Sequence, residues 1–300
     1  MSSMVIFHSA DRVKLPRPMI FQFNTEAEYA GFGVIPPRPD MVQPKVRPPR
    51  DEALAKMKQV IKNRNQADCL EDVNNDNFLL RFLHTRKMNP ETSVDLLENY
   101  IHFRKTHPEI FGQLSLKDPY VQICLRNRFP GVLPDRDRNG RCVLFLSLRN
   151  WSSHLFSLEA IFKSLLLLMD SLLVDTKIQY SGFVFLLDWN QTSIYASPTL
   201  LRTMISGLQD CYPARFKAIH FINEPVQVDV LLALVKPFLK EKTRDKIIVH
   251  GQNLDSLYGY LPRDILPIEI FNGSVPIASC IHKELIVPPG PATRRTLGIV

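Results

Sequence analysis

Apolar side chains recur every three or four residues between positions 51 and 112, the spacing that places them on one face of a helix. One series begins at Asp51, a second follows Asn75 or Asp76 as its cap, and a third starts at Pro90, which suits a first helical position. The pattern predicts a small all-helical module. Its apolar positions are Leu54, Met57, Val60, Ile61, Phe78, Leu79, Phe82, Leu83, Val94, Leu97, Tyr100, Ile101 and Phe103.

After about Leu116, short continuous apolar runs alternate with helical patterns. Strands that are apolar on both faces and are separated by helices are typical of a mainly parallel sheet covered by helices. We therefore predict an α/β domain at 113–275. Its expected strands are 141–148, 182–189, 216–225 and 246–251, and its expected helices are 157–174, 198–211 and 226–239.

The two ends of the chain have a different composition. Residues 1–50 include a proline-rich stretch at 34–50 with few large apolar residues, which favours a mobile arm. Residues 276–300 hold several prolines and the pair Arg294-Arg295, and we expect them to form a loose basic tail.

The formal charge of +7 favours an acidic partner, either nucleic acid or an anionic membrane. The five cysteines are scattered and form no Cys-x-x-Cys pair, as expected of reduced thiols in the cytoplasm. No apolar run approaches the roughly 18 residues of a membrane span, and the N-terminus lacks the pattern of a signal peptide. These features predict a cytoplasmic protein without a transmembrane helix.

The residue types that catalysis requires are poorly represented. The chain has no Gly-x-Ser-x-Gly motif, no glycine-rich loop that opens a helix, and no histidine pair at metal-binding helical spacing. Asp188 and Glu224 follow expected strands and could do acid–base work, but such carboxylates more often cap loops. His220 is more often a hydrogen-bonded core residue. We expect no enzyme, metal or cofactor, and a hydrolase that uses Asp188 and His220 is the least favoured alternative.

Residues 226–239 are apolar almost all round, whereas a surface helix needs one apolar stripe. The surplus indicates contact with protein core, a ligand cavity or a membrane. Basic residues follow at once in the segment 236–246. An apolar helix beside lysines is attracted to an anionic membrane, and the lack of interleaved aromatics or a recognition motif argues against nucleic acid.

The segment 76–111 resembles the helical entry module of CRAL-TRIO lipid-transfer proteins, and 130–145, 182–189, 208–225 and 236–257 resemble successive parts of their lipid-binding domain. The resemblance spans roughly 51–270 in the right order. Among subfamilies, the chain is most similar to the group of clavesins, cellular retinaldehyde-binding protein and alpha-tocopherol transfer protein.

This resemblance implies a cavity between the sheet and the apolar helix 226–239, which would act as a movable gate for one hydrophobic small molecule or lipid. The candidate lining residues, each of which could also be ordinary core, are Phe162, Leu165, Leu166, Met169, Phe183, Phe185, Leu187, Ile194, Leu201, Ile222, Val230 and Leu234.

The resemblance also implies a basic cleft for a phosphoinositide headgroup, at the positions Arg86, Arg215, Lys217, Lys242 and Lys246. Cations that converge from separate segments make charge-assisted hydrogen bonds to phosphate. The implied protein is a lipid carrier that associates peripherally with intracellular membranes, of which endosomal membranes are one candidate. The alternative is a membrane-recruitment scaffold with a vestigial cavity.

Overall fold

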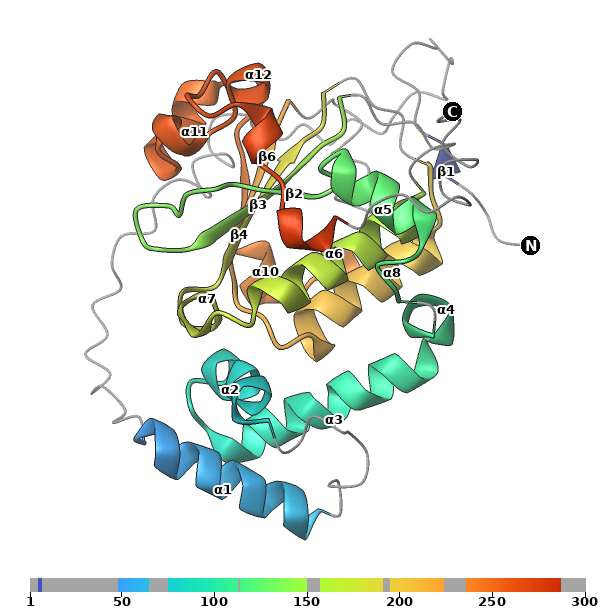
Figure 1. Ribbon diagram of the computed structural model, residues 1–300, viewed down its shortest axis with the longest axis vertical. Coiled ribbons are helices and arrows are strands. Elements are labelled where there is room, and N and C mark those ends of the chain that lie inside the picture. The colour runs from blue at the N-terminus through green and yellow to red at the C-terminus, as the bar shows by residue number, and fades with distance from the viewer. Residues whose placement is uncertain are drawn as a thin grey trace.

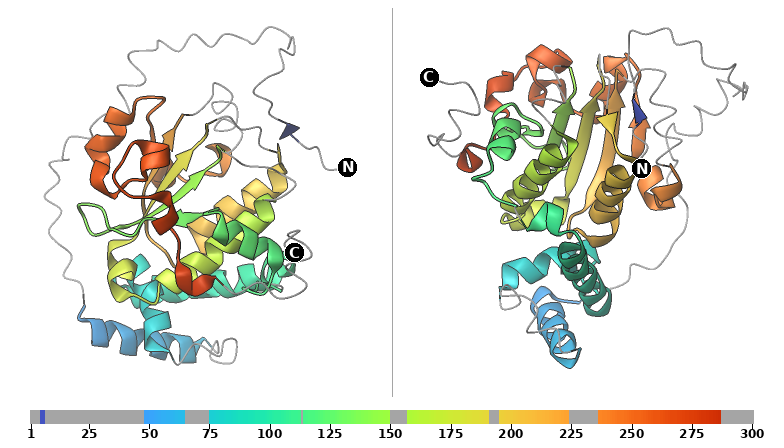
Figure 2. Two further views of the ribbon diagram at one scale, coloured as in Figure 1. Left: turned by 45° about the horizontal axis from the view of Figure 1, so that its top comes forward. Right: turned by 90° about the vertical axis from the view of Figure 1, so that its right-hand side faces the viewer.

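The computed structural model places a layer of helices beneath a larger domain built around a sheet (Figure 1). The helical layer lies at the lower edge of the molecule in two further views as well (Figure 2). The described residues are 5–6, 48–64, 75–112, 114–149, 157–190, 195–223 and 236–286.

The helical layer consists of α1 (Arg50–Asn63), α2 (Asp76–Thr85) and α3 (Pro90–Thr106), as the periodicity predicts. The Asn75 side chain caps α2 by accepting a hydrogen bond from the Phe78 backbone N–H, so the cap is Asn75 and not Asp76. The apolar stripes of the three helices face one another and form part of one buried cluster. Burial of these stripes, more than intrinsic propensity, holds such short helices in place.

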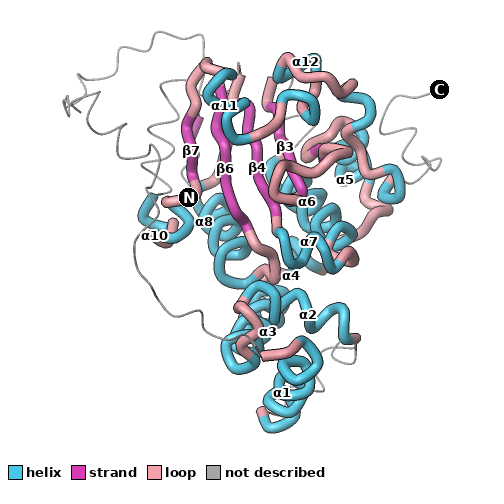
Figure 3. The backbone as a smooth tube through the Cα atoms, turned by 90° about the vertical axis from the view of Figure 1, so that its left-hand side faces the viewer, coloured by secondary structure: helices cyan, strands magenta, loops and turns pink. Residues whose placement is uncertain are grey.

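Five strands form the main sheet, in the order β2-β3-β4-β6-β7. The last four run parallel, and β2 pairs antiparallel with β3 at one edge. Figure 3 shows the four parallel strands side by side. Their bounds are β2 (Gly131–Val132), β3 (Cys142–Ser147), β4 (Phe183–Asp188), β6 (Phe216–Ile222) and β7 (Ile247–Val249).

One face of the sheet packs against α6 (Leu158–Leu172), and the other packs against α11 (Leu254–Tyr260) and α12 (Ile268–Phe271). We name these the α6 face and the α11 face. The remaining elements are β1 (Val5–Ile6), α4 (Pro108–Phe111), α5 (Pro119–Arg126), α7 (Thr176–Ser181), β5 (Tyr195–Ala196), α8 (Pro198–Ser206), a π-helical turn at Gly207–Cys211, α10 (Glu241–Arg244) and short 3₁₀ turns at Lys236–Phe238, Arg263–Ile265, Ile277–Ser279 and Lys283–Leu285.

The prediction of a loose C-terminal tail is wrong for residues 276–286, the part of it that the structure describes. Cys280 is fully buried against the α11 face, and Leu285 is buried in the cluster around α6. The buried Gln122 side chain donates a hydrogen bond to the Leu285 carbonyl at 2.9 Å. Proline content suggested looseness, but apolar contacts and satisfied backbone groups fix residues 276–286 onto the domain.

Candidate functional site

The two faces of the sheet are covered to different extents. Val184 and Leu186 on the α11 face of β4 are fully buried. Phe185 and Leu187, the intervening residues on the α6 face, keep part of their surface accessible. Interiors normally pack without gaps. The α6 face of an inner strand therefore carries apolar surface that is not fully covered.

Adjacent strands continue this partly accessible surface. Leu146 on β3, Ile219 on β6 and Ile247 on β7 are apolar, partly accessible and grouped with Leu187. None of the nine residues of α8 is fully buried, although the helix carries Leu200, Leu201, Met204 and Ile205. We give the name apolar wall to this set of partly accessible side chains, a surface suited to an apolar ligand. Its members are Phe185, Leu187, Leu146, Ile219, Ile247, Leu200, Leu201, Met204 and Ile205.

The sequence-predicted cavity residues on α6 all lie on this side of the sheet. Phe162, Leu165, Leu166 and Met169 are buried in one cluster with Phe183, against which Phe185 also packs. Leu187 and Leu201 are partly accessible. Ile194, Val230 and Leu234 lie outside the described residues, as do Glu224 and most of the expected helix 226–239.

Ile222 is the exception, because it packs on the α11 face. Strict alternation from Phe216 would place it on the α6 face. However, the register between β4 and β6 shifts between the pairs Phe183↔Phe216 and Val184↔Ala218, so that an extra residue reverses the alternation. The residues that sequence reasoning missed are Phe216, Ile219 and Phe221, which the register places beside the cavity-face residues of β4. The bulge leaves no clear signal in the sequence.

Three of the predicted phosphoinositide-binding cations lie close together at the amino-terminal end of β6 and β7. Lys246 directly precedes β7, and its pKa is lowered by burial and by the nearby charges of Lys242 and Arg215. Lys217 lies two residues after Arg215, on the bulged end of β6. We name these three cations, Arg215, Lys242 and Lys246, together with Lys217 of β6, the basic cluster. Mutual repulsion among these cations favours an anion at this place.

Arg86 lies on the helical module, directly after α2. Burial lowers the pKa of its guanidinium, and the carboxylates of Asp210 and Asp95 oppose that effect. Asp210 also forms an ion pair with Lys240. The electrostatic neighbours of Arg86 are thus carboxylates, which sets it apart from the basic cluster.

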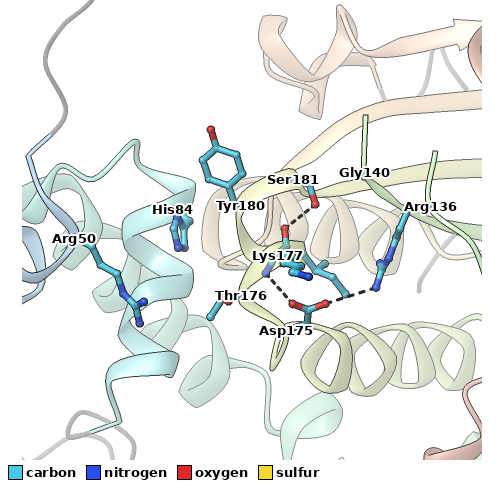
Figure 4. A pocket seen from close by; sticks show the side chains of 10 residues that line it. Arg50, His84, Arg136, Gly140, Asp175, Thr176, Lys177, Tyr180 and Ser181 are labelled. Atoms are coloured by element: carbon cyan, nitrogen blue, oxygen red, sulfur yellow. Dashed lines mark hydrogen bonds and ion pairs between the residues drawn. The ribbon is translucent and has the colours of Figure 1, made fainter. Parts of the chain in front are cut away.

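A cleft of about 560 Å³ opens between the helical module and α7. Arg50 and His84 face it from the helical module, and Lys177 and Tyr180 face it from α7 (Figure 4). The Tyr180 ring is in edge contact with His84 and lies under the guanidinium of Arg215. Tyr180 therefore lies between this cleft and the basic cluster.

Asp188 has a structural role at the ends of the strands. Its carboxylate accepts hydrogen bonds from the Ser147 hydroxyl at 2.7 Å, the Asn223 amide at 2.8 Å and the Asn190 backbone N–H at 3.2 Å. It is fully buried and lies 3.6 Å from the Arg149 guanidinium. These contacts hold three loops together and satisfy the charge.

His220 is also a core residue. Its Nδ1 lies 2.9 Å from Nε2 of His250, whose Nδ1 lies 2.9 Å from the Ser256 hydroxyl. Burial lowers the pKa of His220 to about 3 and that of His250 to about 4, so both imidazoles are neutral at pH 7. The pair lies on the α11 face, with Tyr260 packed against both rings.

Within the part of the chain that the structure describes, none of the helices combines the length and the apolar character that a membrane span requires. No group of three or more His, Cys, Asp or Glu side chains in the same residues is arranged to hold a metal ion.

Comparison with known proteins assigns the fold. The CRAL/TRIO domain family matches residues 126–271, the region that holds the sheet and α6. The chain is 40% identical over 205 residues to Clavesin-1 of Xenopus laevis, a match that covers 67% of this chain and 61% of that protein. It belongs to the CRAL-TRIO family.

Other relatives agree with this assignment. Clavesin-2 of Homo sapiens is also 40% identical over 205 residues, which cover 67% of this chain and 62% of that protein. The chain thus spans about 60% of the length of the curated relatives it matches. The crystal structure of Sfh5 has the same CRAL-TRIO fold, with a TM-score of 0.55 at 18% identity, and the match covers 83% of this chain and 96% of that one.

Proposed function

We propose that this CRAL-TRIO protein binds a hydrophobic lipid against the apolar wall and carries it between membranes without chemical change. The observation that carries the proposal is the contrast on β4, where the partly accessible Phe185 and Leu187 alternate with the fully buried Val184 and Leu186. The CRAL-TRIO family and the clavesin relatives support lipid binding and transfer in general.

Apolar burial supplies the driving force for such binding. Each CH₂ group that leaves water contributes about 0.8 kcal/mol, so a chain of ten carbons that contacts the wall gains roughly 8 kcal/mol before ordering costs. The residues of the wall are aliphatic or aromatic, which favours a largely apolar cargo over one that needs many hydrogen bonds.

The second half of the proposal is that the protein docks on phosphoinositide-bearing membranes through Arg86 and the basic cluster. Burial lowers the pKa of Lys246, the charges of Lys242 and Arg215 lower it further, and Asp245 opposes them. The proximity of these three cations supports an anion site there, because a bound phosphate would relieve the repulsion among them. Docking of this kind would give peripheral association with intracellular membranes, of which endosomes are one candidate.

Charge reversal tests the docking site. The double variant Lys242→Glu and Lys246→Glu should bind phosphatidylcholine vesicles that contain a phosphatidylinositol phosphate at least about tenfold more weakly, since each cation near a membrane contributes about 1 kcal/mol. Vesicle flotation measures the loss. Lipid that co-purifies with the chain should be retained, because neither lysine is itself part of the apolar wall.

The matched control changes the same net charge elsewhere. Lys62 and Lys117 are exposed on the helical module and before α5, and the variant Lys62→Glu with Lys117→Glu should bind these vesicles within about twofold of the unmodified chain. Equal losses in the two double variants would mean that only overall charge matters, and the assigned docking site would be wrong.

A further inference from the structure

The cleft between α7 and the helical module has a composition that differs from the apolar wall. Its charged lining residues are Arg50 at the start of α1, Arg136 in the loop between β2 and β3, Asp175 at the cap of α7 and Lys177 within α7. Among the described lining residues, three cations face one carboxylate, which leaves an excess of two positive charges. All four side chains are at least partly exposed to solvent in the cleft, so a ligand can reach them.

The single carboxylate does not close the site. Asp175 lies 3.8 Å from the Arg136 guanidinium, and its other role is to accept a hydrogen bond from the Lys177 backbone N–H at 2.8 Å. A guanidinium carries five N–H donors, so Arg136 can keep this contact and still bind an anion. Thr176 and Tyr180 add hydroxyl groups to the lining.

His84 supplies a further sign that positive charge predominates in the described part of the cleft. Burial lowers the pKa of its imidazole, and the positive charges of Arg215 and Arg50 lower it further. No carboxylate is among the causes that act on it. A neutral histidine at this place can donate a hydrogen bond to an anion without adding repulsion between cations.

We propose that the cleft is a second anion site that binds a compound with at least two phosphate charges. Arg50 and His84 hold the ligand from the helical module, while Arg136 and Lys177 hold it from the sheet domain (Figure 4). The ligand therefore bridges the two parts of the chain. The site adjoins the proposed docking site without sharing its lysines: Tyr180 contacts both His84 and Arg215, and the charge of Arg215 acts on His84.

Inorganic pyrophosphate is a suitable probe, because it carries the required charges and no lipid. The full chain should bind it, and the variant Arg50→Gln with Lys177→Gln should bind it at least about tenfold more weakly, as expected when two charge-assisted contacts are lost. Lys62→Gln with Lys117→Gln is the matched control and should retain the affinity. Isothermal titration calorimetry compares the three proteins.

The His84 imidazole gives a second readout that locates the ligand. Bound pyrophosphate places negative charge beside it and favours the imidazolium, so the pKa of His84 should rise in a titration followed by nuclear magnetic resonance. Arg50, Arg215 and Tyr180 are the groups that face this ring. No change in the His84 titration at saturating pyrophosphate would overturn the proposal.

Two further outcomes distinguish the sources of the phosphate. If Arg50→Gln with Lys177→Gln weakens the binding of both pyrophosphate and phosphoinositide vesicles, the natural ligand is a lipid headgroup. Loss of pyrophosphate binding alone indicates a free phosphorylated compound. If Lys242→Glu with Lys246→Glu abolishes pyrophosphate binding while Arg50→Gln with Lys177→Gln does not, the anion binds at the basic cluster and the second site does not exist.

Discussion

The α6 face and the α11 face use the same strands and the same kinds of residue, yet on β3 and β4 the α11 face is packed throughout and the α6 face only in part. On the α11 face, Val143, Val184 and Phe271 are almost completely buried. On the α6 face, Leu146, Phe185 and Ile219 remain partly accessible. The composition of a strand therefore does not decide whether its side chains are buried or partly accessible. The elements that cover the strand decide it.

The α11 face resembles the interior of any stable domain, where each side chain fills its space. The α6 face carries apolar surface that is stabilised when a further apolar group covers it. This difference separates a face that holds the fold together from the face on which we propose that cargo binds. It also determines how substitutions on the two faces should behave.

The largest difference is expected between neighbouring leucines on β4. Leu186→Ala should lower the free energy of unfolding by about 2–5 kcal/mol, because it leaves a cavity in a fully buried site. Leu187→Ala should cost about 1 kcal/mol in the lipid-free chain, because its partly accessible site loses less buried area. Urea unfolding measures both. Equal losses would mean that the two faces are equally packed.

A smaller, pH-dependent effect is expected from the histidines of the α11 face. The pKa values of His220 and His250 are lowered to about 3 and about 4, below the value of 6.5 expected in the unfolded chain. The unfolded chain therefore binds protons first as the pH falls. The stability that the neutral pair provides is complete above pH 6.5 and is lost progressively between pH 6.5 and about 3.

The variant His250→Gln tests this linkage, because glutamine can still hydrogen-bond but does not titrate. Urea unfolding at pH 7 and pH 5 should reveal a smaller loss of stability in the variant than in the unmodified chain. An identical loss in both proteins would assign the acid sensitivity to other groups.

The fold was largely accessible to sequence reasoning because apolar periodicity reports local structure directly. The expected strand 182–189 corresponds to β4 at Phe183–Asp188, and the expected helix 157–174 corresponds to α6 at Leu158–Leu172. The β6 bulge was not predicted, because it depends on pairing with β4. The packing of Cys280 was missed because its neighbourhood is rich in proline and short of periodic apolar residues.

The candidate site was accessible only in part. The proximity of Arg215, Lys242 and Lys246 comes from the pairing of β6 with β7. The resemblance implied a shared cleft at these positions, whereas the apolar pattern alone does not. Ile222 was grouped with the wrong face because one extra residue reverses alternation. The cleft at α7 was not predicted, because Arg50, Arg136 and Lys177 are far apart in the sequence and form no motif.

The most direct test of the lipid-binding wall is the amount of lipid that co-purifies with the full chain, measured by native mass spectrometry and by extraction into organic solvent. The unmodified protein should carry a stoichiometric hydrophobic molecule. Leu187→Trp should lose most of it, because the larger ring fills space beside the wall. Ile268→Trp, at an exposed position on α12, should retain it. An unmodified chain without lipid, or equal loading of the two tryptophan variants, would contradict the assignment of the α6 face as the cargo site.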